Sequence, residues 1–290
     1  MAKYQGKYIK KAARKRSGLL SVILPLVFTA MMAVGGWKLF SEQQTYRVGS
    51  NTYEALAATA VKQYTPEEAA DAPVPFETEI SAPDDAFLQE ELAPPGGMSQ
   101  TLPVLQVDFP LLQSVNSQIV GWIFGSDGAI NYPVVLGGDN SYYLRRLVDG
   151  TPNQNGSIFM DYRNAADLSH RNTFIYGHNM KNGAMFASLS SYASPEYYRQ
   201  HPELILVMPD RTWCLQVFSG YVTPGNSDIY QIDFESEEEF AAYLERVKSF
   251  SDITTDVQVT TKDRIVTLST CTYDYEDARY VLHCKLIPMQ

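Results

Sequence analysis

Cysteine and histidine are scarce in this chain of 290 residues, with three and four copies respectively. Cys214, Cys271 and Cys284 are too few for a dense disulfide framework, although one bridge plus one free thiol remains open. No His, Cys or carboxylate cluster has the spacing of metal ligands, so we predict neither a metal nor another cofactor. With so few candidates, each thiol and imidazole can be weighed separately.

Acidic residues are absent from residues 1–17, which hold seven of the 23 lysines and arginines. Beyond Lys38 the balance reverses, because 15 basic residues stand against all 33 acidic ones and give a net charge of -18. A body this acidic repels a phosphate backbone, so we predict no nucleic-acid partner.

No charge occurs in the twenty residues from Gly18 to Trp37. As a helix this run is about 30 Å long, enough to cross the hydrocarbon core of a membrane, where Pro25 is tolerated. Cations before the run and few after it predict a cytoplasmic N-terminus and an extracellular remainder. A cleaved signal peptide is the alternative, but the run is long for one. We therefore expect a basic tail (1–17) followed by an uncleaved single-pass anchor (18–38).

Large apolar residues are few in the next unit. Six prolines and clustered acids lie between Thr65 and Gln100, which is typical of a disordered, self-repelling linker. The segment from Gly49 to Tyr64 has a composition that can form a short helix. We expect residues 39–101 to be an extracytoplasmic linker, whose reach is on the order of 40 Å for about 60 flexible residues.

Short runs rich in β-branched and aromatic residues, separated by turn signals, follow from Leu102 onward. The expected strands are 119–124, 129–135, 156–160, 172–176, 203–208, 212–222, 256–259, 264–269 and 279–286. This spacing predicts a mainly β domain, a sandwich or a barrel, over residues 102–290. Peripheral helices are expected at 108–118, 188–200 and 236–250, the last with acids in its first turn and cations near its end.

Cys271 ends the apolar run Thr267-Leu-Ser-Thr-Cys271 and precedes a polar loop. A free cysteine is more commonly a buried structural residue than a nucleophile. Small polar neighbours, which leave room for a substrate backbone, favour the nucleophile here. A free thiol has a pKa of about 8.5, so a nearby cation would raise the thiolate fraction at neutral pH.

His178 is the candidate partner of the thiol, because it follows a strand that stops at Gly177 and so stands in a loop. A histidine that caps a turn is the alternative. His170 and His201 lie in loop contexts. His283 lies within a strand, where it and the adjacent Cys284 point to opposite faces and cannot form a dyad.

Arg279 opens the strand after the cysteine loop. A guanidinium is permanently charged and carries a fork of donors, so it can stabilise the oxyanion of an acyl-transfer intermediate. If the two strands are neighbours, its side chain reaches the same groove as Cys271. A surface arginine paired with Asp274, Glu276 or Asp277 is the alternative.

Together these motifs resemble the sortases, the membrane-anchored cysteine transpeptidases of Gram-positive bacteria, and class B most closely. The resemblance covers about residues 107–286. Its carriers are Val120-Gly-Trp-Ile, Asn131-Tyr-Pro-Val-Val, Asp139-Asn-Ser-Tyr-Tyr-Leu144, Gly156-Ser-Ile-Phe-Met-Asp-Tyr-Arg-Asn164, Asn172-Thr-Phe-Ile-Tyr-Gly-His-Asn-Met180 and Thr267-Leu-Ser-Thr-Cys271. The helix at 236–250 fits the long inserted helix of class B. The resemblance implies an eight-stranded sortase β-barrel with helices at its N-terminus and in the insertion.

The resemblance also implies roles. Cys271 would attack the carbonyl after threonine in a C-terminal sorting signal of a secreted protein and form a thioacyl intermediate. His178 would protonate the leaving amine and deprotonate the incoming one, and Arg279 would hold the substrate carbonyl and oxyanion. An amine of a lipid-linked peptidoglycan precursor, or of a pilin, would resolve the intermediate.

By the same resemblance, substrate contacts would come from Asn140, Leu144, Tyr230, Ser269 and Thr270. Three alternatives remain open. The first is a thiol hydrolase that uses water as the acceptor. The second is a pilin-polymerising sortase, whose usual Asp-Pro-aromatic lid motif does not occur before the expected barrel. The third is a non-catalytic surface module, which would not need the cysteine.

Overall fold

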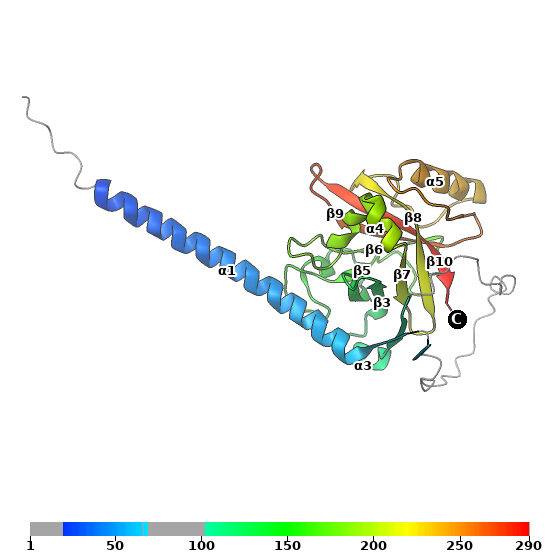
Figure 1. Ribbon diagram of the computed structural model, residues 1–290, viewed down its shortest axis with the longest axis horizontal. Coiled ribbons are helices and arrows are strands. Elements are labelled where there is room, and N and C mark those ends of the chain that lie inside the picture. The colour runs from blue at the N-terminus through cyan, green and yellow to red at the C-terminus, as the bar shows by residue number, and fades with distance from the viewer. Residues whose placement is uncertain (1–19, 66, 69–101, 290) are drawn as a thin grey trace, which may run out of the picture. The chain divides into compact units, whose positions relative to one another are not determined.

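The structure is a computed structural model that describes residues 20–65, 67–68 and 102–289. It consists of two compact units, Met1–Thr45 and Tyr46–Gln290. The second unit holds a closed β-barrel with helices around it (Figure 1).

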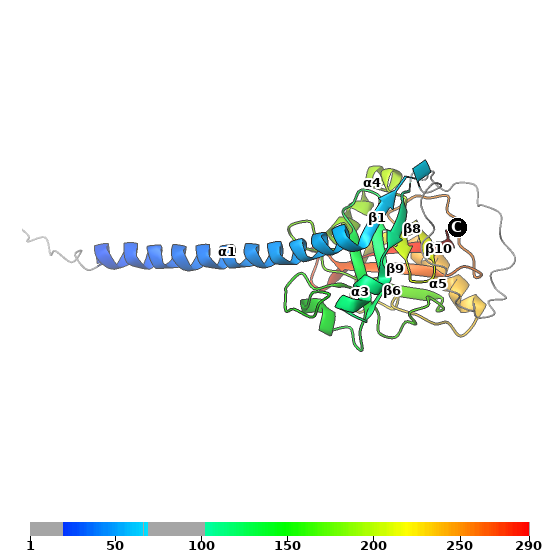
Figure 2. The ribbon, with the colours of Figure 1, turned by 90° about the horizontal axis from the view of Figure 1, so that it is seen from below.

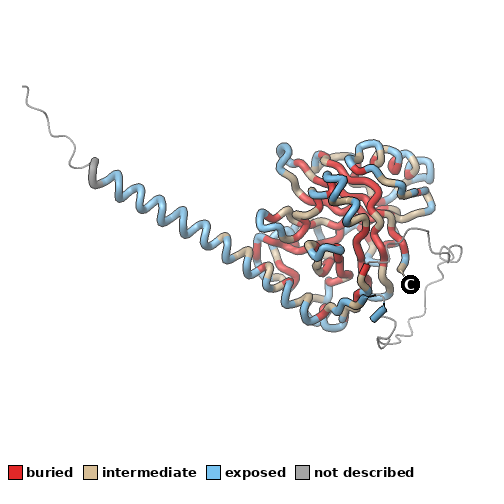
Figure 3. The backbone as a smooth tube through the Cα atoms, viewed as in Figure 1, coloured by how far each residue is buried: buried red, intermediate tan, exposed pale blue. Residues whose placement is uncertain are grey.

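Helix α1 spans Leu20–Ala60 and therefore continues well past the uncharged run. Every residue from Ile23 to Phe40 is exposed (Figure 3), and most of them are apolar, as expected for a surface that meets lipid. In length and composition it is the one helix among the described residues that could cross a membrane. The predicted basic tail, residues 1–17, lies outside the described residues.

The start of the predicted linker differs from expectation. Residues 39–60 continue α1 without interruption, and β1 (Val61–Tyr64) then pairs antiparallel with β2 (Val104–Val107). Alanine-rich sequence supports the helix, and Tyr53 is almost fully buried against the barrel unit. The second unit thus begins at residue 46, well before the predicted boundary at residue 102. Residues 66 and 69–101 of the predicted linker lie outside the described residues.

Eight strands close the barrel in the order β10-β8-β7-β3-β4-β5-β6-β9. They are β3 (Ile119–Gly125), β4 (Asn131–Leu136), β5 (Ile158–Met160), β6 (Asn172–Tyr176), β7 (Glu203–Val207), β8 (Thr212–Pro224), β9 (Ile265–Cys271) and β10 (Ala278–Pro288). Neighbours pair antiparallel except β4–β5 and β6–β9, which pair in parallel. The predicted mainly β fold with an eight-stranded barrel is confirmed.

One expected strand, 256–259, is wrong, because residues 251–260 form an irregular connection. Val257 and Val259 still pack against the second core described below, which explains the apolar alternation. The backbone there bonds locally, as where Val257 N–H donates to Thr255 Oγ1 at 3.2 Å. Since the barrel is already closed, no strand edge is left for this segment to join.

The helices outside α1 are short. They are α3 (Phe109–Val115), η1 (Tyr142–Arg145), η2 (Ala187–Ala193), α4 (Pro195–Gln200) and α5 (Glu237–Ser249). The expected helix 188–200 is split into η2 and α4, because Pro195 lacks an N–H and starts a new helix. Asp108 caps α3, where its side chain accepts from Leu111 N–H at 2.9 Å.

Helix α5 builds a second core on the outside of the barrel. Ser236 caps its first turn, and its buried side chains Phe240, Tyr243, Leu244 and Val247 join apolar residues of β6, β8, β9 and β10. Helix α5 contacts β8 whereas α3 contacts β3, so the two helices lie over different parts of the barrel (Figures 1 and 2).

Candidate active site

Strands β6 and β9 bring His178 and Cys271 together. The two strands pair in parallel, with Tyr176 opposite Ser269. His178 and Cys271 each follow two residues later, so both lie at the same end of the strand pair. A bond of 3.1 Å from Gly177 N–H to Ser269 O extends the pairing beyond β6. Two segments almost a hundred residues apart in the chain thus place His178 and Cys271 at neighbouring positions at one end of the strand pair.

Arg279 lies directly opposite Cys271 in the antiparallel pair of β10 and β9. Side chains of directly paired residues lie on one face of a sheet, so the predicted adjacency of the two strands is confirmed. The Arg279 guanidinium also pairs with Asp277 at 2.7 Å and donates to Ala278 O at 3.1 Å. The pairing with Asp277 that was the alternative for this residue is thus present, while the arginine side chain keeps 29% of its surface exposed.

A cleft of about 440 Å³ opens at this end of the strands. Its lining includes every residue that sequence reasoning selected: Asn140, Leu144, His178, Tyr230, Ser269, Thr270, Cys271 and Arg279. The volume falls in the range of ordinary ligand sites. The structure therefore gathers these residues in one place, from η1, β9, β10 and the loops that hold Asn140, His178 and Tyr230.

The hydrogen bond of His178 defines which ring nitrogen is engaged. Its Nε2 lies 2.6 Å from the carbonyl oxygen of Leu144. A carbonyl can only accept, so Nε2 carries the hydrogen and Nδ1 is the nitrogen left for proton exchange. The next residue, Asn179, donates from its amide to Cys271 O at 2.9 Å. The histidine loop and the cysteine strand are thereby tied to each other.

Gly177 explains how the chain turns so tightly before the imidazole. A Cβ at this position would lie 2.4 Å from Ile158 Cδ1 and 2.7 Å from the Phe186 ring. No other residue fits that gap without moving the core. The glycine therefore holds the His178 loop close against β5 and η2.

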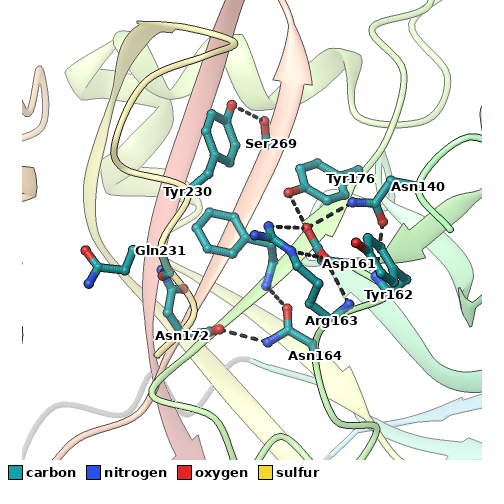
Figure 4. Close-up of polar contacts among 11 residues, drawn as sticks. Asn140, Asp161, Tyr162, Arg163, Asn164, Asn172, Tyr176, Tyr230, Gln231 and Ser269 are labelled. Atoms are coloured by element: carbon teal, nitrogen blue, oxygen red, sulfur yellow. Dashed lines mark hydrogen bonds and ion pairs between the residues drawn. The ribbon is translucent and has the colours of Figure 1, made fainter. Parts of the chain in front are cut away.

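A buried carboxylate forms the wall of the cleft, and sequence reasoning missed it. Asp161 accepts from Asn140 Nδ2 at 3.0 Å, from Tyr176 OH at 2.9 Å and from the Arg163 guanidinium at 2.8 and 2.9 Å (Figure 4). Burial by itself raises the pKa of this carboxyl, but the hydrogen bonds, led by those from Arg163, outweigh it and hold the pKa below its usual range. The only sequence signal was the Asp-Tyr-Arg run after a short strand.

This network fixes the amide of Asn140. Its Nδ2 donates to Asp161, and its Oδ1 accepts from Tyr162 N–H at 3.0 Å. Both ends of the amide are assigned by chemistry, because the carboxylate can only accept and the backbone N–H can only donate. One N–H of the amide remains without a bond to the network.

Tyr230 and Ser269 meet on the other side of the cleft, with their hydroxyls 3.1 Å apart (Figure 4). Burial raises the pKa of Tyr230, so the phenol stays protonated and can donate. Thr270 borders the cleft too, but its side chain lies on the opposite face of β9 from Ser269 and Cys271. Its hydroxyl is buried and has no hydrogen-bond partner among the described residues.

The structure also bears on disulfides and metals. All three cysteines are free, so the open alternative of one bridge is not realised. Within the described residues, no group of three or more His, Cys, Asp or Glu side chains is arranged to hold a metal ion.

Comparison with known proteins finds sequence similarity to one protein family. A family profile described as the sortase domain matches residues 127–287. Sortase B of Listeria monocytogenes is 41% identical over 180 residues, which cover 61% of this chain and 72% of the relative. Sortase B of Staphylococcus aureus is 36% identical over 192 residues, which cover 66% of this chain and 79% of the relative.

Solved structures agree with these relatives. The Staphylococcus aureus sortase B–substrate complex superposes with a TM-score of 0.60 at 37% identity, covering 63% of this chain and 85% of that one. Sortase B of Clostridium perfringens superposes with a TM-score of 0.60 at 30% identity, covering 62% of this chain and 100% of that one.

Proposed function

Since the chain belongs to the sortase family and is a cysteine transpeptidase of the sortase B type, we propose that it cleaves secreted proteins after the threonine of a C-terminal sorting motif and transfers the acyl group to a cell-wall amine. The observation that carries this proposal is the meeting of Cys271, His178 and Arg279 in one cleft. Each comes from a different strand or loop, and each supplies one part of acyl-transfer chemistry.

In the first half-reaction, the Cys271 thiolate attacks the threonine carbonyl and forms the S–C bond. The carbonyl electrons move to oxygen, and the Arg279 guanidinium stabilises that negative charge. The C–N bond then breaks, and the imidazolium of His178 gives its proton to the leaving amine. A thioester between the substrate threonine and Cys271 remains.

In the second half-reaction, the incoming amine attacks the thioester carbon. Neutral His178 takes the proton that the amine loses, and the thiolate of Cys271 leaves. One amide bond is broken and another is made, so no oxidant, reductant or energy-rich co-substrate is needed. The fixed Nε2–H of His178 supports this role, because it leaves Nδ1 as the single site of proton exchange.

The cleft walls offer matching contacts for an extended peptide. Asn140 presents a fixed amide with one free N–H, which suits a backbone carbonyl or an amide side chain of the sorting motif. Leu144 adds an exposed apolar surface, and the Tyr230–Ser269 pair adds hydroxyls. Thr270 would act through its backbone, since its side chain lies on the other face of β9.

Location follows from the N-terminal segment. The family is associated with the cell surface, and α1 holds an apolar stretch long enough to anchor the chain. The cations before that stretch support a cytoplasmic N-terminus and an extracellular catalytic unit. Enzyme, sorting substrate and lipid-linked peptidoglycan precursor would then meet at the same membrane surface.

The test is whether an amine captures the acyl group. The full chain in detergent micelles is incubated with a library of sorting peptides, with and without a primary amine. We expect an amine-linked product and an acyl-enzyme mass on Cys271, with the same mass retained in Cys214→Ala as a matched control. If hydrolysed peptide is the only product at every amine concentration, the enzyme is a hydrolase and the transfer proposal fails.

A further inference from the structure

We propose that the last turns of helix α1 position the imidazole of His178, with Tyr53 as the positioning residue. This inference rests on the proposed function, because it takes His178 as the proton-transfer group. Tyr53 is not part of the cleft lining, so it acts through other residues. Two routes of contact lead from it to His178.

The first route runs through the segment before β5. The side chain of Tyr53 is 2% exposed, and its hydroxyl donates to Gly156 O at 2.6 Å and lies 3.0 Å from Ser157 Oγ. Ser157 Oγ in turn donates to Arg146 O at 2.9 Å. A residue of α1 thereby ties together two points of the segment that leads into the cleft.

Gly156 lies directly behind the group that holds His178. Its φ is +61°, and a Cβ there would lie 2.7 Å from Leu144 O and 3.0 Å from His178 Cδ2. The Leu144 carbonyl is the acceptor of the His178 Nε2–H bond. The next amide, Ser157 N–H, donates to Tyr143 O at 3.0 Å. A shift of Gly156 therefore moves both the carbonyl and the surface on which the imidazole rests.

The second route runs through the loop after His178. The Tyr53 ring packs edge-on against Tyr132, with ring centres 5.4 Å apart. The Tyr132 hydroxyl accepts from Met185 N–H at 3.0 Å, and the adjacent Phe186 N–H donates to His178 O at 2.9 Å. One α1 side chain thus supports the segments on both sides of the imidazole.

Close contact of the helix backbone makes this support rigid. A Cβ at Gly49 would lie 2.4 Å from Asn155 Nδ2. One turn before Tyr53, the α1 backbone is therefore so close to the 153–157 segment that a larger side chain would clash with it. Reacting groups displaced by about 1 Å can lose about 100-fold in rate. Loss of the Tyr53 hydroxyl loosens the 153–157 segment but leaves it in place. It is therefore expected to lower the rate of the catalytic step.

The experiment compares two Tyr→Phe variants of the full chain in detergent micelles. Tyr53→Phe removes the hydroxyl that reaches Gly156. Tyr64→Phe is the matched control, because its hydroxyl lies 3.1 Å from Gln106 Oε1 in the β1–β2 pair and neither residue lines the cleft. We expect Tyr53→Phe to lower kcat about tenfold with KM changed less than about twofold, and Tyr64→Phe to keep both within about twofold.

A second readout does not depend on turnover. With only four histidines in the chain, the imidazole N–H resonance of His178 can be assigned in ¹⁵N-histidine-labelled protein by comparison with His178→Gln. We expect this resonance to move upfield or broaden in Tyr53→Phe, because the bond to Leu144 O is loosened, and to stay in place in Tyr64→Phe.

The outcomes separate the inference from the proposed function. If His178→Ala still turns over normally, the proposed role of His178 fails. If His178→Ala is inactive but Tyr53→Phe keeps the wild-type kcat and resonance, only the positioning inference fails. It fails too if Tyr64→Phe loses as much kcat as Tyr53→Phe, because the effect would then be general destabilisation.

Discussion

Two pairs of histidine and cysteine occur in this barrel, and they differ in where the strands place them. His178 and Cys271 come from the neighbouring ends of β6 and β9 and are half-buried at the cleft. His283 and Cys284 are adjacent on β10 and are fully buried. A substrate in the cleft can therefore reach the His178–Cys271 pair, whereas it cannot reach the His283–Cys284 pair.

Burial decides the chemistry of the second pair. Desolvation lowers the pKa of His283 to about 3, so the ring is neutral, and it raises the pKa of Cys284 well above its ordinary value. His283 lies 2.9 Å from the hydroxyl of Thr267 and 3.2 Å from that of Tyr221, in the core under α5, whereas Cys284 belongs to the barrel interior. A thiol without solvent or a cation beside it stays protonated, so reactivity here follows position and not residue type.

Removing one thiol from each pair is expected to give the largest difference in activity between the two pairs. Cys271→Ala is expected to lower the rate of peptide transfer by at least about 1,000-fold, because the nucleophile is gone. Cys284→Ala is expected to keep kcat within about twofold while it lowers the free energy of unfolding by about 1 kcal/mol, since it leaves a small cavity. Steady-state kinetics and urea unfolding measure both. Normal transfer by Cys271→Ala would contradict the assignment.

A smaller effect is expected along β10, which carries a cation at each end of its pairing with β9. Arg279 lies opposite Cys271 and Lys285 lies opposite Ile265. Arg279→Ala is expected to lower kcat about 100- to 1,000-fold through loss of oxyanion stabilisation. Arg279→Lys should recover only part of that, because an ammonium lacks the planar fork.

Lys285→Ala is the matched control for charge loss on the same strand. Its ammonium pairs with Asp263 at 3.1 Å, far along the strand from the thiol. We expect kcat to stay within about twofold of wild type. Equal losses in the Arg279 and Lys285 variants would show that net charge, and not the position opposite Cys271, sets the rate.

The smallest expected effect is the pH dependence that His283 imposes on stability. An unfolded histidine binds a proton below about pH 6.5, whereas folded His283 does so only near pH 3. The free energy of unfolding therefore falls as pH drops below about 6.5, with a slope of up to about 1.4 kcal/mol per pH unit from this group. In urea unfolding, His283→Gln should reduce the slope of the unfolding free energy against pH between about pH 6.5 and 5. An unchanged slope would show that His283 is not its cause.

Local sequence patterns were enough to predict most strands of the barrel. Eight of the nine expected strands correspond to β3–β10, because runs of β-branched and aromatic residues bounded by turn signals favour strands. The failure at 256–259 has a tertiary cause, since Val259 is buried and Val257 partly buried in the core that α5 forms, without a strand to pair with. Composition allowed a short helix from Gly49 to Tyr64, but not its continuity with the apolar run as one helix, because helix propensity cannot reveal that Tyr53 finds a buried acceptor in Gly156.

The candidate site was predictable in part. Cys271, His178 and Arg279 stand at the ends of strands, where small or polar neighbours make them visible in the chain. Asp161 was not visible, because a buried carboxylate is recognised by the donors around it, and Asn140, Arg163 and Tyr176 come together only in the folded protein. The inert nature of His283 as an acid or base likewise depends on burial under α5.

The residue order therefore determines which groups stand at strand ends and which elements can form, since these are properties of neighbours along the chain. Closure of the barrel decides the rest. It makes β6 and β9 neighbours in parallel, and it buries one histidine–cysteine pair while it leaves the other at a cleft. Long-range pairing and loss of solvent set those distances and pKa values, and neither is a property of any local stretch of sequence.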